Sequence, residues 1–212
     1  MRMQDLLASK LAEIKQVYVV SPNEIESLYP VSDYFDAVRN KLGHVSYTPV
    51  FFTALGTIIA RKIHAIQSRP YKCVVIDCDQ TLWKGVSAED GIAGIEVDAP
   101  RRELQEFLVA RHEAGMLICI CSKNNERDVV EVFEQGRGMV LRRDQVVSWR
   151  INWESKSDNI RSLARELNLG LDSFIFIDDN PVECAEVAAN CAGVLLLQLP
   201  PDAAAIPRFL KH

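Results

Sequence analysis

Short runs of apolar residues alternate, from about residue 71 onward, with segments in which apolar residues recur every three or four positions. Near-continuous apolar runs of about five residues are typical of parallel strands that are covered on both faces. Between the runs, Leu104, Phe107 and Leu108 stand at helical spacing, and later segments repeat the pattern. This alternation predicts an α/β fold, doubly wound around a parallel five-stranded sheet. The expected strands are Cys73–Asp77, Leu117–Ser122, Val146–Ile151, Phe174–Asp178 and Val194–Gln198.

The first 70 residues lack this alternation. Their pattern predicts a helix near residues 4–16, a short strand at Val17–Val20 and a second helix near residues 48–66. Thr48 is a good N-cap, and Pro49 after it suits the first position of that second helix. The expected domains are residues 1–70, a short and mostly helical N-terminal appendage, and residues 71–212, the α/β domain.

Composition and charge fit an ordinary globular protein. The chain has 212 residues, of which 48% are hydrophobic and 25% charged, so disorder is excluded as its main state. Its formal net charge is −5, from 24 basic and 29 acidic residues. Non-specific nucleic-acid binding needs basic patches that neutralise phosphates, so we expect no nucleic-acid partner.

The sequence also predicts a cytoplasmic chain without a membrane span. The first 16 residues scatter Asp, Lys and Glu where a signal peptide would need an uninterrupted apolar run. The apolar stretch Val50–Ala60 stops at Arg61 and Lys62, well short of the roughly 20 residues that cross a bilayer. None of the six cysteines forms a C-x-x-C pair, and four lie in or beside buried runs, which favours a reducing compartment.

Polar side chains follow most of the predicted strands at the points where the strands end. In open α/β sheets ligands bind outside these carboxyl ends. Taken singly, each residue has an ordinary interpretation: Asp179 can be a turn former beside Pro181, and Lys156 a solvated surface lysine. Together they favour a ligand site. The residues in question are Asp77, Asp79, Thr81, Ser122, Lys123, Asn124, Lys156, Asp178 and Asp179.

This combination of side chains suits phosphoryl transfer. Carboxylates can hold Mg²⁺, which neutralises phosphate charge, and one carboxylate can instead attack phosphorus. Asp79, two residues after Asp77, can protonate the leaving oxygen and later activate water. Ser122 can hydrogen-bond a phosphoryl oxygen, and Lys156 supplies a cation. There is no G-x-x-x-x-G-K-S/T loop, so the sequence does not predict a P-loop nucleotide site.

The order of these residues resembles the haloacid dehalogenase superfamily of phosphotransferases. Its four motifs stand here as Asp77-x-Asp79-x-Thr81, Ser122, Lys156 and Asp178-Asp179. The resemblance implies a Rossmann-like sheet of order 5-4-1-2-3. The 20 residues from Thr81 to Pro100 leave room for a small flap and no large cap.

The same resemblance implies roles for individual residues. Asp77 would be the nucleophile and a metal ligand, and Asp79 the acid/base, with its backbone carbonyl also on Mg²⁺. Asp178 would complete the metal site, assisted by Asp179. The phosphoryl group would be held by Ser122 and Lys156, with Thr81 as a further member of the first motif.

Longer strings narrow the resemblance to the FkbH-like branch of that superfamily. They are VIDCDQTLWKGVSAEDG (75–91), CSKNN (121–125) and FIDDNPVE (176–183). These domains are associated with polyketide assembly lines. The resemblance implies that a glyceryl group passes from 1,3-bisphosphoglycerate, with loss of phosphate, to the phosphopantetheine arm of an acyl carrier protein as a thioester. Ser87 stands where this branch often has another residue, in some members cysteine.

The thioester requires a thiolate to attack the C1 carbonyl carbon. Either Cys78 carries the acyl group or the carrier protein's own thiol attacks directly, and the sequence leaves both open. Lys123 and Asn124 are candidates for binding substrate. Trp83 either lines the site or packs the flap down. Two other functions remain: a plain phosphatase acting on a small phosphate ester or phosphoprotein, and a catalytically silent docking module, which the intact motifs disfavour.

Overall fold

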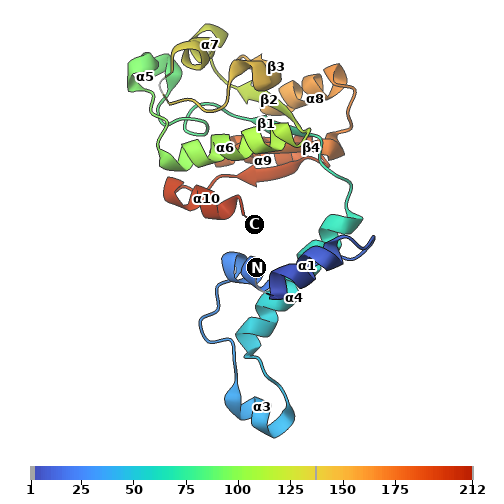
Figure 1. Ribbon diagram of the computed structural model, residues 1–212. Helices are drawn as coiled ribbons and strands as arrows, with labels where there is room; N and C mark the ends of the chain where they lie inside the picture. Colours follow the sequence, from blue (N-terminus) through green and yellow to red (C-terminus); the bar gives the residue numbers. More distant parts are fainter. Residues whose placement is uncertain (1–2, 137, 212) are drawn as a thin grey trace. The chain divides into compact units, whose positions relative to one another are not determined.

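The computed structural model describes residues 3–136 and 138–211 (Figure 1). By its internal contacts the chain divides into two compact units, Met1–Arg69 and Pro70–His212.

The N-terminal unit is helical. Its helices are α1 (Met3–Ala12), α2 (Pro22–Leu28), α3 (Ala37–Gly43) and α4 (Pro49–Gln67). The prediction for α4 is confirmed, since Thr48 Oγ1 accepts a hydrogen bond from the Phe51 N–H at 3.4 Å and Pro49 is the first helical residue. The sequence pattern missed α2 and α3, because seven residues are too few to show a helical period.

The first helix ends earlier than expected, and the predicted strand at Val17–Val20 is wrong. After Ala12 the chain makes two turns, and Gln16 takes the left-handed conformation (φ 67°), which cannot continue a right-handed helix. Among the described residues no strand pairs with Val17–Val20. β-branched residues favour a strand only where a neighbouring strand accepts their backbone hydrogen bonds.

Helix α4 is the one helix in the described part of the chain that is long and apolar enough to cross a membrane. Length and composition alone are weak support for a span, because core helices of other proteins meet the same criteria. Arg61 and Lys62 lie within it, where charged groups are costly in a bilayer.

The C-terminal unit is built on a five-stranded, all-parallel sheet of order β3-β2-β1-β4-β5. The predicted fold class and sheet order are confirmed. The strands are β1 (Cys73–Ile76), β2 (Leu117–Ser122), β3 (Val146–Ile151), β4 (Phe174–Asp178) and β5 (Leu195–Gln198). β1 ends one residue before the predicted Asp77, although the Asp77 N–H still bonds to the Ile177 carbonyl at 3.0 Å.

Helices cover both faces of this sheet (Figure 1). The larger ones are α6 (Ala99–Glu113), α7 (Glu126–Gln135), α8 (Lys156–Glu166) and α9 (Pro181–Asn190), and a short α10 (Ile206–Phe209) follows β5. Successive β1 residues point to opposite faces. Val74 and Ile76 pack with α6 and α7, whereas Cys73 and Val75 pack with α8 and α9.

The segment between β1 and α6 forms the expected small flap. It holds one short helix, α5 (Ser87–Gly94), and a two-residue bridge in which Lys84 and Glu96 exchange backbone hydrogen bonds of 2.9 and 3.1 Å. A flap of this size leaves the carboxyl ends of the central strands open to substrates.

Two valines on α9 test the packing of the sheet. Val187 is fully buried and Val182 is 74% exposed on the same helix. We expect Val187→Ala to lower the free energy of unfolding by about 2 kcal/mol, because two buried methyl groups are lost. Val182→Ala should change it by less than about 0.5 kcal/mol. Denaturation followed by tryptophan fluorescence measures both, since Trp83, Trp149 and Trp153 all lie in this unit. Equal effects of the two substitutions would contradict this packing.

Candidate active site

The carboxyl ends of β1, β2 and β4 meet at a cavity of about 210 Å³. Since these three strands are neighbours in the sheet, the residues that follow them converge although they are far apart in sequence. The cavity is lined by Asp77, Asp79, Gln80, Ser122, Lys123, Lys156, Asp178, Asp179, Asn180 and Glu183. Seven of the residues singled out in the sequence are in this set: Asp77, Asp79, Ser122, Lys123, Lys156, Asp178 and Asp179.

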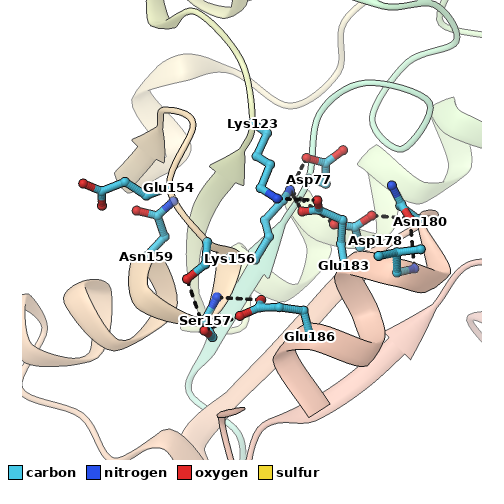
Figure 2. Close-up of polar contacts among 12 residues, drawn as sticks. Asp77, Lys123, Glu154, Lys156, Ser157, Asn159, Asp178, Asn180, Glu183 and Glu186 are labelled. Carbon is cyan, nitrogen blue, oxygen red and sulfur yellow. Dashed lines mark hydrogen bonds and ion pairs between the residues drawn. The ribbon is translucent and has the colours of Figure 1, made fainter. Parts of the chain in front are cut away.

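Lys156 lines the cavity, is almost fully buried and points toward Asp77 (Figure 2). Its Nζ donates to Asp77 Oδ1 at 2.5 Å and to the Cys121 carbonyl at 2.6 Å, and it lies 3.2 Å from Asp178 Oδ2. Burial lowers the pKa of Lys156, but Asp77 and Asp178 raise it by more, so its pKa lies above the ordinary value. Lys156 is therefore a permanent cation in the site.

Two contacts at the start of α8 fix the position of Lys156. Ser155 caps the helix by accepting the Asp158 N–H at 3.1 Å. Ser157, the residue after Lys156, donates its N–H and its hydroxyl to the Glu186 carboxylate of α9, at 3.1 and 2.5 Å (Figure 2). The sequence pattern gave no signal for Glu186, since a single glutamate on a helix usually faces solvent.

Asp77, Asp178 and Asp179 form an acidic cluster in which one carboxylate oxygen of each lies within 4.8 Å of the others. Asp178 Oδ2 is buried without a hydrogen-bond partner. Burial and the neighbouring Asp77 raise the pKa of Asp178 to about 7, against the opposing effect of Lys156. Burial also raises the pKa of Asp179. Converging carboxylates that are short of positive charge suit Mg²⁺, which prefers oxygen ligands.

The cluster corresponds in part to the predicted metal ligands. Asp77 and Asp178 are members, and Asp179, expected only to assist, is the third. The Asp79 carboxylate is bonded elsewhere, and the expected contact of the Asp79 backbone carbonyl with Mg²⁺ stays a prediction. Thr81, expected near the phosphoryl group, is fully buried; its hydroxyl donates to Asp179 Oδ1 at 3.1 Å and accepts the Asp179 N–H at 3.2 Å. Thr81 therefore orients Asp179 and does not line the cavity.

Trp83 and Asn124 also lie behind the cavity wall and not in it. Trp83 is fully buried in the core. Of the two alternatives for this residue, it therefore packs the flap down and does not line the site. Asn124 is 2% exposed and, like Trp83, donates a hydrogen bond to the Asp79 carboxylate. In this geometry, neither side chain is therefore placed to contact substrate directly.

Cys78 points away from the site. It is fully buried in the core cluster that contains Leu82 and Leu104, and it does not line the cavity. Burial, followed by the charge of Asp77, raises the pKa of the Cys78 thiol well above its ordinary value, against a smaller opposing effect of Lys156. Since only a thiolate is a competent nucleophile, this placement disfavours Cys78 as a nucleophile or covalent acyl carrier.

Lys123 and Glu183 form an ion pair at the edge of the cavity. Lys123 Nζ lies 2.7 Å from Glu183 Oε1, and the side chain of Lys123 remains 39% exposed. The second oxygen of Glu183 is buried, lacks a hydrogen-bond partner and lies 3.8 Å from Lys156 Nζ. Glu183 is not predicted as a site residue from the sequence, because an acidic residue in the first turn of a helix is ordinary there.

Gln80, also not predicted, lines the cavity in a left-handed conformation (φ 57°). Its carbonyl accepts two hydrogen bonds from the Arg101 guanidinium, at 2.9 and 3.2 Å. Arg101 is in turn paired with Asp98, at 2.7 Å. These bonds hold a backbone conformation that is unfavourable for a residue with a side chain.

Comparison of the sequence with known protein families and with curated proteins finds no match. Among solved structures, the N-terminal part of the protein BF1531 from Bacteroides fragilis, containing a phosphatase domain complexed with Mg, matches with a TM-score of 0.81 and 32% identity. The match covers 97% of this chain and 57% of that one, so this chain spans a little over half of its length. The chain has the haloacid dehalogenase fold.

Smaller enzymes of the haloacid dehalogenase family also align, at lower similarity. A family hydrolase from Xanthomonas campestris has a TM-score of 0.49 and 13% identity over 68% of this chain and 96% of its own. An enzyme from Bacteroides thetaiotaomicron, solved with magnesium and inorganic phosphate, has a TM-score of 0.46 and 13% identity over 62% of this chain and 96% of its own.

The raised pKa of Asp178 predicts that Mg²⁺ binding depends on pH. Only the ionised carboxylate binds a cation, and below a pKa of about 7 Mg²⁺ must displace a proton from Asp178. The affinity should therefore fall about tenfold between pH 8 and pH 6, one proton being displaced at the lower pH. Isothermal titration calorimetry at the two pH values measures this. Asp178→Asn should bind more weakly and lose the pH dependence, and an unchanged wild-type affinity would contradict the assignment.

Proposed function

We propose that this chain is a Mg²⁺-dependent phosphotransferase that acts through a phosphorylated Asp77, and that its basic activity is that of a phosphatase on small phosphate esters. The observation that carries the proposal is that Asp77 lines the cavity, is bonded to the buried Lys156 and belongs to the acidic cluster. The similarity to a phosphatase domain solved with Mg supports it. Six free, buried cysteines are ordinary in the cytoplasm, where we place this activity.

The reaction proceeds in two steps. An Asp77 carboxylate oxygen attacks phosphorus, and the bond to the leaving oxygen breaks as Asp79 gives that oxygen a proton. Water then attacks the phosphorus of the aspartyl-phosphate and passes a proton to Asp79, which releases inorganic phosphate and restores both carboxyl groups. Ser122 donates a hydrogen bond to a phosphoryl oxygen. Lys156 keeps the nucleophile oriented and offsets the charge that phosphate brings.

Charge balance explains why the reaction depends on Mg²⁺. Among the described residues that line the cavity, Lys156 is the one buried cation beside Asp77, Asp178 and Asp179, so a phosphate dianion would meet an excess of negative charge. A bound Mg²⁺ would be held by Asp77 and Asp178, with Asp179 beside them, and would neutralise phosphate charge. Asp178 Oδ2 is buried, lacks a hydrogen-bond partner and shares the Lys156 cation with Asp77, so it would gain from a bound Mg²⁺.

Asp77→Asn tests the nucleophile. With p-nitrophenyl phosphate and Mg²⁺, we expect this substitution to lower kcat by about 10³-fold or more, because the amide cannot form the phosphorylated intermediate. Asp144→Asn, an isosteric change at an aspartate whose side chain is 70% exposed, should leave kcat unchanged. Phosphate release by Asp77→Asn at the wild-type rate would refute the mechanism.

A narrower proposal follows from the FkbH-like strings and the small flap. We propose that the phosphoryl donor is 1,3-bisphosphoglycerate and that its glyceryl group is loaded onto the phosphopantetheine arm of an acyl carrier protein. An open site suits a long arm presented by another protein. The arm's thiolate attacks the C1 carbonyl carbon and the C1 phosphate leaves. The C3 phosphate ester is removed through Asp77.

Intact mass spectrometry separates this proposal from a plain phosphatase. The chain is incubated with Mg²⁺, freshly generated 1,3-bisphosphoglycerate and a holo acyl carrier protein. We expect a glyceryl adduct on the carrier with wild type and with Cys78→Ala, because the buried Cys78 takes no part. Asp77→Asn should leave the C3 phosphate on the adduct. Release of free phosphate with no acyl adduct would refute transfer and leave a phosphatase.

A further inference from the structure

The carboxylate of Asp79 accepts hydrogen bonds from three N–H donors, two in the flap and one after β2. Its Oδ1 accepts from the Trp83 indole Nε1 at 2.9 Å and from the Ser87 backbone N at 3.1 Å. Its Oδ2 accepts from the Asn124 side-chain Nδ2 at 2.7 Å. Trp83 belongs to the turn after β1, Ser87 begins α5 in the flap, and Asn124 follows β2. Bonds from three directions fix the rotation of the carboxyl group.

The bonds distinguish the two oxygens of Asp79. A carboxylate offers about two acceptor positions on each oxygen. Both positions of Oδ1 are taken, by Trp83 and Ser87, whereas Oδ2 has one bond, from Asn124. Asp79 lines the cavity. Oδ2 is therefore the oxygen with an acceptor position left for a proton shared with substrate or water.

Trp83 and Asn124, the two side chains that bond to Asp79, are themselves fixed by further contacts. Trp83 is fully buried and packs edge-on against Phe133, with ring centres 6.0 Å apart. The Asn124 Nδ2 also donates to Ser87 Oγ at 2.7 Å, and its Oδ1 accepts the Asn125 N–H at 2.9 Å. With both its N–H groups and its carbonyl engaged, the Asn124 amide has one orientation. Supports of this kind keep a catalytic group within narrow limits.

We propose that Asn124 and Trp83 are positioning residues that orient Asp79 so that Oδ2 exchanges the proton with the leaving oxygen and then with water. The inference rests on the proposed function, in which Asp79 is the acid/base. It replaces the expectation that these two side chains contact substrate. In the first step the Oδ2–H bond breaks as the leaving oxygen takes the proton, and in the second Oδ2 takes a proton from the attacking water.

Substrates that differ in leaving group test this role. p-Nitrophenolate leaves without needing a proton, whereas the alkoxide of an alkyl phosphate such as glycerol 3-phosphate must be protonated as it leaves. The assay uses kcat/KM of the full chain with Mg²⁺, because this ratio reports the step in which the leaving group departs. We expect Trp83→Phe and Asn124→Leu to lower kcat/KM by about 10- to 100-fold for the alkyl phosphate and by less than about threefold for the aryl phosphate.

Control variants decide among the outcomes. Asp79→Asn should show the same leaving-group pattern with a larger loss. Asn125→Ala changes the neighbouring asparagine, whose side chain bonds to Asp128 at the surface, and should leave both substrates unaffected. Thermal unfolding checks that each variant is folded at the assay temperature.

Equal losses on the two substrates in both variants would overturn the positioning role, since merely structural damage does not distinguish leaving groups. If Asp77→Asn turns over both substrates at the wild-type rates, the proposed function fails and the inference fails with it. If Asp77→Asn is inactive and the two positioning variants match wild type, only the inference fails.

Discussion

A buried ammonium group surrounded by carboxylates is the constraint on which the site depends. Lys156 contacts Asp77 and Asp178 directly, with Glu183 slightly farther away. Burying either sign of charge alone would be costly, so each makes the burial of the other tolerable. The carboxylates outnumber the cation, so the site lacks positive charge, and a divalent metal ion can supply it. The burial of Lys156 and the affinity of the site for a metal ion thus have the same electrostatic origin.

The residues of this charge cluster are far apart in the sequence and are brought together by the fold. Asp77, Asp178 and Lys156 come from three places along the chain, and they meet because β1 and β4 are adjacent and α8 begins at the same edge of the sheet. The apolar faces of the strands hold the sheet between helices, and the polar residues lie just beyond its end. Stability and chemistry therefore occupy different parts of the same strands.

Much of this arrangement could be predicted from the sequence. The strands were visible as apolar runs, and parallel strands align their carboxyl ends, so the convergence of Asp77, Ser122 and Asp178 followed from topology. The positions of Trp83, Asn124 and Thr81 could not be predicted in the same way. Whether a side chain near a site contacts substrate or supports another side chain depends on rotamers and packing, which no periodicity encodes.

Local structure in the N-terminal unit was harder to predict for a different reason. Helices α2 and α3 are stabilised by caps, with Ser21 and Asp36 accepting N–H groups of the first turn, and not by a long amphipathic face. The strand expected at Val17–Val20 depended on a partner that the described chain does not provide. The two errors therefore differ in origin: the strand lacks a non-local partner, whereas α2 and α3 depend on local caps and are too short to show a helical period.

The six cysteines have a practical consequence. All are free and buried, and four lie on the central strands or directly after β1. A thiol reagent added to the folded protein therefore meets no accessible sulfur and can react only when the structure opens. The rate of labelling at each cysteine then measures how often that part of the sheet separates from its helices, which makes the native sequence its own set of reporters on local opening.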